Sequence, residues 1–241
     1  DASVNEGYTE EPDQHALDLK GKSINCNEEV VAAACQLSGK GKSVTLDVQR
    51  KLQGGMYNTM MLPFAIPEKD YLLKVTDMNG NFVFDPKKGG SMPSILVFEG
   101  YETINTGGEE TLQLVFHELG EQPNNQNSEG RQYESVPAYT PFLIQPEEDI
   151  TSRLHFWPAY VIHSVPASNN TGDINFVGHF TPGSVSIPEG SIMLILTSDN
   201  RLAKVTSSGT MMGLRGYFLM PESMKSIPAQ ICIKENITTD T

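Results

Sequence analysis

The sequence predicts an all-β fold, as one β-sandwich or as two packed sandwich domains. Val, Ile, Thr, Tyr and Phe, which favour the pleated surface of a sheet, are frequent throughout the chain. The 21 glycines and 15 prolines fall largely between short apolar runs and mark turns at the spacing of a sandwich. No convincing helical periodicity follows residue 40. The length of 241 residues fits one large all-β unit or two ordinary domains.

The first half of the chain predicts strands and contains one ambiguous segment. Residues 27–37 favour a short helix with an Asn cap and a strand about equally, because a β-branched pair lies among their apolar residues. Ser43–Arg50 alternates apolar and polar side chains and predicts a half-buried strand. Met56–Ile66 is apolar on both faces and predicts a buried strand that ends or bulges at Pro63. Further strands are expected at 72–76, 81–84, 95–101 and 111–118, with a hairpin turn at 79–80.

The second half continues this pattern after a polar stretch. Residues 121–132 (EQPNNQNSEGRQ) predict a linker between two sheets or a long loop. The chain therefore divides into an acidic leader at 1–15, a sandwich half or domain at 16–120, the polar stretch, and a second half or domain at 133–241. Turns are expected at 168–172, 188–190, 199–200 and 207–209. The strands expected in this half are 139–145, 154–164, 174–180, 192–197, 202–206, 216–219 and 230–234.

The charge balance argues against one class of partner. Lys and Arg number 17 and Asp and Glu number 30, which gives a formal net charge of −13. Nucleic-acid binding requires a basic face, and the sequence has no basic stretch that could form one, so we expect no nucleic-acid partner. The chain begins at Asp1 without Met or a basic and apolar leader, so we expect a mature chain from which a signal peptide has been removed. The carboxylate-rich residues 1–15 predict a disordered tether.

Three segments carry sequence motifs that point to a known family. Gly55–Phe64 (GMYNTMMLPF) is similar to a strand written W-N-T-L-C-L-P-F, with Tyr57 in place of the Trp. Ala138–Ile144 (AYTPFLI) is similar to G-x-P-Y-L-I-K, and residues 200–218 contain NRLAKV and GTMMGLRGYF, similar to N-x-L-Y-K and M-K-G-F-R-A-Y-F. In this order, over roughly residues 40–235, the motifs resemble a β-rich domain that recurs in secreted and cell-surface proteins of Bacteroidetes. The resemblance implies an extracellular module and no catalytic residues.

No catalytic, metal or cofactor site is expected from the acidic and histidine residues. The adjacent carboxylates of Glu28–Glu29, Glu109–Glu110 and Glu147–Asp149 lie in turn-like contexts and are interpreted as solvated loops. None of them indicates the facing pair of carboxyl groups that a glycosidase needs. His155 and His163 would lie ~26 Å apart on one strand, too far to share a metal ion.

The cysteines and one arginine have structural interpretations. Cys26 and Cys35 could form a disulfide or stay reduced, and Cys232 completes an odd number of thiols. Arg215 lies within the last motif and is expected to form an ion pair with a carboxylate that fixes the closing strand.

Trp157 and Tyr160 form the candidate binding site. They lie on either side of Pro158 in the segment FWPAY, and exposed Trp and Tyr rings can stack on the C–H faces of sugars. The other interpretation is a Trp that fills the interface between sheets. We expect a non-enzymatic module that is secreted or held at the cell surface, such as by a lipoprotein-type anchor on the outer membrane. Its role would be adhesion-like or structural within a surface assembly, with other surface proteins or a host glycan as partner. The alternative is a glycan-binding module that uses the two aromatic residues.

Overall fold

Strands dominate the part of the chain that the structure describes. The structure is a computed structural model that describes Ala32, Cys35, Gln36, Ser38 and residues 44–48, 50–88, 91–120, 135–161 and 168–234. Within these residues the strands form two five-stranded and two two-stranded sheets. The prediction of an all-β sandwich is confirmed.

The elements follow one another along the chain as a series of short strands. They are β1 (Val44–Val48), β2 (Asn58–Met60), η2 (Lys69–Lys74), η3 (Pro86–Lys88), β3 (Ser94–Thr106), β4 (Glu109–Glu118), β5 (Phe142–Gln145), β6 (Leu154–Ala159), β7 (Ser168–Thr171), β8 (Ile174–His179), β9 (Gly183–Val185), β10 (Ser191–Leu196), β11 (Leu202–Val205), β12 (Gly209–Met211), β13 (Arg215–Pro221), η4 (Glu222–Met224) and β14 (Ala229–Lys234), where η marks a 3-10 helix.

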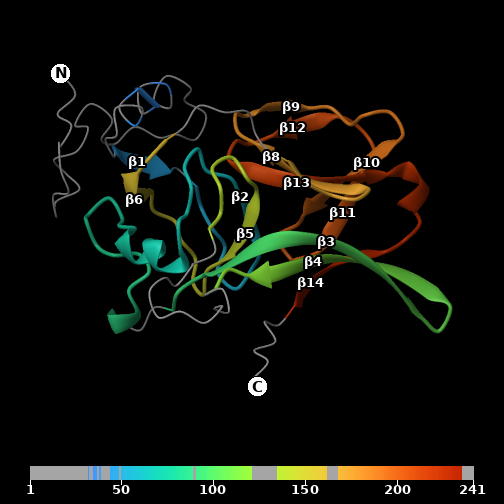
Figure 1. The fold of residues 1–241 in the computed structure, drawn as a ribbon, viewed down its shortest axis with the longest axis horizontal. Helices are drawn as coiled ribbons and strands as arrows, with labels where there is room; N and C mark the ends of the chain where they lie inside the picture. Colours follow the sequence, from blue (N-terminus) through green and yellow to red (C-terminus); the bar gives the residue numbers. More distant parts are fainter. Residues whose placement is uncertain are drawn as a thin grey trace, which may run out of the picture.

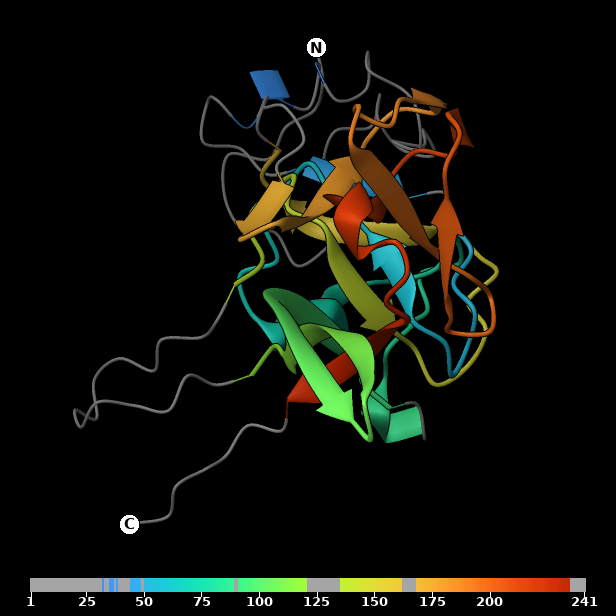
Figure 2. The same cartoon turned by 90° about the vertical axis from the view of Figure 1, so that its right-hand side faces the viewer.

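Two five-stranded sheets face each other and form the sandwich. One sheet has the order β11-β10-β13-β8-β7 and the other β14-β4-β3-β5-β2 (Figures 1 and 2). Four phenylalanines fill the space between them, and the rings of Phe176 and Phe218 stack with their centroids 4.4 Å apart. Phe98 and Phe116 reach these rings from the other sheet, at 5.6 Å from Phe218 and 6.0 Å from Phe176 respectively. Interlocked aromatic rings of this kind stabilise a core beyond the area that they bury.

Two smaller sheets extend the sandwich. The β9–β12 pair lies over the outer face of the β8–β13–β10 region, where Val185, Met193 and Tyr217 form a small buried cluster (Figure 1). The β1–β6 pair lies at the other end of the molecule beside a second large core that includes Phe64, Tyr71 and Phe156. The chain therefore has a sandwich core and a second core beneath the β1–β6 pair.

The second core differs from the sequence prediction in its local structure. Leu72–Thr76 was expected as a strand, but Lys69–Lys74 forms η2. Tyr71 and Leu72 are adjacent and both buried in the same core, which a strand with alternating faces does not allow. Residues 81–84 form only an isolated bridge, between Thr76 and Phe82.

The turn predicted at Asn79–Gly80 is present and has a clear physical basis. Gly80 has a φ of +78°, and Asp77 Oδ1 accepts hydrogen bonds from the backbone N–H groups of Asn79 at 2.7 Å and Asn81 at 2.9 Å. Farther along the chain, 168–172 was expected as a turn, but Ser168–Thr171 is β7, which pairs with β8. The turn itself lies at Gly172, which has a φ of +84°.

The strand β1 is more deeply buried than its alternating pattern indicated. All five of its residues are buried, so the prediction of a half-buried strand is wrong. Its polar face is buried as well: Thr45 is 6% exposed and Asp47, which pairs with His155 of β6, is 0% exposed. The strand expected over Met56–Ile66 is much shorter in the structure, where β2 covers only Asn58–Met60 and ends before Pro63.

Strands from both sides of the polar stretch at 121–132 share one sheet. β5 pairs with β3, and β14 pairs in parallel with β4, with Ala229 opposite Leu112 and Lys234 opposite His117. The leader at 1–15 and the stretch at 121–132 lie outside the described residues, and the division of the chain into two halves or domains stays a prediction. Among the described residues no helix is both long and apolar enough to cross a membrane.

Candidate functional site

A pocket opens where the sandwich meets the second core. Its volume is about 370 Å³, at the lower end of the range for small-molecule sites. The residues that follow β1, the start of β2, the loop between β5 and β6, the turn after β10 and the first residue of β13 all line it. Arg50, Lys51 and Arg215 make this wall cationic, and Asp149 adds one carboxylate.

Arg50 is held at the pocket by its backbone and by one side-chain hydrogen bond. Its N–H donates to Val48 O at 3.1 Å, and its Nη1 donates to Leu214 O at 3.2 Å. The residue is only 7% exposed, and among the described residues its buried Nε has no hydrogen-bond partner. A buried guanidinium without a counter-charge is costly, and an anion in the pocket offsets part of that cost.

Arg215 brings a second guanidinium to the same pocket. It begins β13, is partly buried, and also has a buried Nε with no hydrogen-bond partner in the part of the chain that the structure describes. Burial lowers the pKa of Arg215. Burial, followed by repulsion from Arg215, lowers the pKa of Arg50 to about 9. Both groups are therefore charged at neutral pH, and in the described part of the chain neither forms an ion pair with a carboxylate.

The opposite wall of the pocket is fixed by backbone contacts. Leu52 and Ile150 exchange hydrogen bonds, with N···O distances of 2.9 and 2.8 Å, and tie the segment after β1 to the loop before β6. Asp149 Oδ1 accepts the N–H of Gly54 at 2.7 Å. A Cβ at Gly54 would lie 2.5 Å from the backbone carbon of Glu148, so only glycine permits this approach. Glu147–Asp149, interpreted from the sequence as a solvated loop, thus contributes Asp149 to a pocket wall.

Left-handed backbone conformations hold two parts of this site. Leu214 is fully buried with a φ of +58°, and its carbonyl accepts the bond from Arg50. Asn200 has a φ of +60°, and its Oδ1 accepts the N–H of Tyr57 at 2.7 Å. Non-glycine residues in this region carry strain, and such strain is often kept where a functional geometry requires it.

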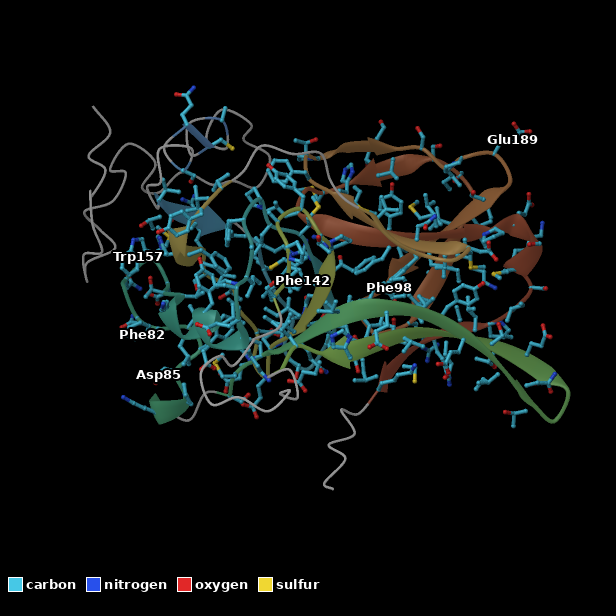
Figure 3. All side chains as sticks on the ribbon, in the orientation of Figure 1. Phe82, Asp85, Phe98, Phe142, Trp157 and Glu189 are labelled. Carbon is cyan, nitrogen blue, oxygen red and sulfur yellow. The ribbon has the colours of Figure 1, made fainter. Side chains whose placement is uncertain are left out.

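The residues predicted as the binding site lie elsewhere. Trp157 is on β6, at the end of the molecule formed by the β1–β6 pair and away from Phe98 in the sandwich (Figure 3). Its side chain is half-buried, with the indole nitrogen inaccessible. Tyr160 follows β6 and is 45% exposed. Neither lines the arginine pocket.

The sequence interpretation missed the arginine pair. Arg50 and Arg215 lie in segments far apart in the chain, and no spacing or motif links them. The expected ion pair of Arg215 is wrong: among the described residues no carboxylate pairs with Arg215, and its charge acts instead on a second cation, Arg50. Cys35 and Cys232 are free thiols, and Cys26 lies outside the described residues. Among the residues described, no cluster of three or more His, Cys, Asp or Glu could hold a metal ion.

No protein-family model, curated protein or solved structure matches this chain.

Proposed function

We propose that this chain is a non-enzymatic binding module of a secreted or cell-surface bacterial protein, adhesion-like or part of a surface assembly, and that it holds an oxyanion of its partner at Arg50 and Arg215. One observation carries the proposal: two guanidinium groups line an open pocket, and within the described residues neither is paired with a carboxylate. The all-β sandwich and the motif resemblance to Bacteroidetes surface domains support the location.

The arrangement favours an anion for electrostatic reasons. Burial and mutual repulsion both make the two charged arginines unfavourable in the empty pocket. An oxyanion in the pocket supplies the missing counter-charge, so part of the cost of folding is recovered when the ligand binds. Guanidinium groups donate in a planar fork that fits carboxylate and phosphate oxygens.

Anion-dependent stabilisation of the full chain tests this proposal. Thermal unfolding is followed while acetate or phosphate replaces chloride at constant ionic strength. A ligand that binds only the folded state raises Tm in a saturable way, so we expect a rise with the oxyanions beyond that with chloride. The rise should be lost in Arg50→Met and in Arg215→Met.

The matched control is Arg201→Met, which removes the same charge from a side chain that is 83% exposed and outside the pocket. This variant should keep the full response to acetate and phosphate. A Tm that is the same in chloride, acetate and phosphate would indicate that the anions act by screening alone, and it would overturn the proposal. A rise in Tm with the oxyanions that persists in both Arg50→Met and Arg215→Met would also overturn the proposal.

A glycan-binding surface at Trp157 and Tyr160 is the second candidate, supported by the exposure of the Tyr160 ring. The single Trp makes its test direct. Quenching or a spectral shift of Trp fluorescence on addition of a glycan, lost together with binding in Tyr160→Ala, supports this surface. Glycan binding that is unchanged in Trp157→Ala and Tyr160→Ala rejects it.

A further inference from the structure

The arginine pocket offers more than its two cations to a ligand. The side chains of Gln53, Tyr57, Thr151 and Ser198 line it, and within the described residues none of them forms a hydrogen bond with another protein group. Hydroxyl and amide groups both donate and accept, so these side chains can bind groups that do the same. Tyr57 also supplies an aromatic ring.

Two other polar residues of the pocket are already used inside the protein. Asn58 Nδ2 donates to the carbonyls of Gln53 and Met56 at 3.0 and 2.8 Å. Thr197 Oγ1 donates to Asp199 at 2.5 Å and accepts the N–H of Arg201 at 3.2 Å. The pocket therefore separates polar groups that hold its walls from polar groups that remain available to a ligand.

We propose that the ligand is a carboxylated sugar, a uronic or sialic acid residue of a glycan, whose carboxylate binds Arg50 and Arg215. Its hydroxyl groups bind Ser198, Thr151 and Gln53, and the Tyr57 ring packs on a C–H face. This inference rests on the proposed function, since it uses the same pair of arginines. It accounts for the uncharged groups around the cations, which a simple inorganic anion leaves unused.

The charge of the whole molecule also favours an isolated carboxylate. The pocket places three cations and one carboxylate in a protein of net charge −13. The overall negative field repels densely charged polymers, whereas a glycan with one acidic group per residue brings a single charge to a local positive site. The volume of about 370 Å³ suits one sugar residue better than an extended chain.

The test compares ligands that differ in one group. Isothermal titration calorimetry of the full chain is carried out with the methyl glycoside of glucuronic acid (methyl glucuronide, with a free carboxylate), N-acetylneuraminic acid, methyl glucoside, acetate and phosphate. Methyl glucoside keeps the ring of the glucuronide and lacks its carboxylate. We expect at least one sugar acid to bind about tenfold or more tightly than acetate, with no detectable binding of methyl glucoside, because each added hydrogen bond contributes up to about a factor of ten.

Variants of the protein separate the contribution of the carboxylate to binding from that of the sugar ring. Arg215→Met should abolish binding of the sugar acid. Ser198→Ala and Gln53→Ala, both at exposed positions, should each weaken it about three- to tenfold, and more than they weaken acetate. Arg201→Met should leave the affinity unchanged, because Arg201 does not line the pocket.

The outcomes distinguish failure of the sugar-acid inference from failure of the proposed oxyanion-binding function. If acetate or phosphate binds as tightly as both sugar acids, and this binding is lost in Arg215→Met, the sugar-acid inference is overturned and the oxyanion site is retained. Methyl glucoside that binds as well as the glucuronide overturns the role of the carboxylate. Failure of every anion to bind overturns both the inference and the proposed function.

Discussion

Asp47 and His155 face each other across the β1–β6 pair, with His155 Nδ1 2.6 Å from Asp47 Oδ1. The Asp47 side chain is fully buried and that of His155 is 14% exposed. A buried carboxyl group that loses its partner has no water to replace it, and breaking such a pair costs about 3–5 kcal/mol. We therefore expect His155→Leu to lower the free energy of unfolding by an amount in this range, measured by urea denaturation.

A second histidine provides the control for this pair. His117 Nδ1 lies 3.0 Å from Glu99 Oε1, but the Glu99 side chain is 40% exposed and can be hydrated. His117→Leu should therefore cost clearly less than His155→Leu. The double variant Asp47→Leu with His155→Leu should recover part of the loss, since it leaves no carboxyl unpaired. Equal costs for the two single histidine variants would contradict this account.

Arg50 makes stability depend on pH in a predictable direction. Burial lowers its pKa to about 9 in the folded protein, below the value of an exposed arginine in the unfolded chain, so the folded state loses this proton first as pH rises. Above about pH 9 the unfolded state binds more protons than the folded state, and the contribution of Arg50 to the free energy of unfolding rises with pH. The full cost of the buried charge is present below about pH 9.

Arg50→Met removes that cost, so the variant should be more stable than the unmodified protein at pH 7. The gain is reduced by about 1 kcal/mol through loss of the hydrogen bond to Leu214 O. The advantage should shrink as pH rises above about 9, where the unmodified protein begins to lose the charge. Urea denaturation at a series of pH values from neutral to alkaline measures the difference. A difference that does not change with pH would show that the charge of Arg50 does not govern it.

Gly54 allows close backbone packing beside Gln53 and Asp149, two residues that line the arginine pocket. Its missing side chain lets the backbone at Glu148 and Asp149 approach, with the nearest atom 2.5 Å from the position of a Cβ. Gly54→Ala must displace this backbone, so we expect a loss of about 1–3 kcal/mol in stability and weaker oxyanion binding. Thermal unfolding with and without acetate measures both effects. Gly209→Ala, where nothing lies within 4 Å, should change neither.

Gly216 allows close packing inside the sandwich. A Cβ at this position would lie 2.6 Å from Cε2 of Phe176 and 3.1 Å from Cβ of Pro141. Gly216→Ala should displace the Phe176 ring from its stack with Phe218 and destabilise the protein by about 1–3 kcal/mol. Changes in the chemical shifts of both rings, together with the denaturation midpoint, report the effect. Gly183→Ala has open space around it and should be nearly neutral.

The sequence predicted those strands whose own residues determine their structure. β3, β4, β8 and β13 carry regular apolar patterns, and their positions follow from these patterns. β7, β9 and β12, with the sequences SNNT, GSV and GTM, have no such pattern. They become strands because a neighbouring strand offers them backbone partners, and that information lies outside the segment itself.

The candidate site was beyond sequence analysis for a similar reason. Arg50 follows an ordinary strand, and Arg215 lies in a closing motif where an ion pair was the natural expectation. Their proximity arises only when the start of β13 packs beside the segment after β1. A single aromatic cluster such as Trp157 and Tyr160 is visible in one window of sequence, whereas a pair of cations joined by tertiary packing is not.

The parallel pairing of β14 with β4 sets the order in which the molecule can be completed. Residues 229–234 cover the edge of a strand that ends at Glu118, so that edge keeps unpaired N–H and C=O groups while all the intervening chain is being synthesised. An open edge of this kind can pair with other extended chains. Long-range strand pairing is also slow to form, because the loop must close before the contacts are gained. Final folding of this sheet therefore follows synthesis of β14, and a nascent chain remains open to aggregation through β4 until then.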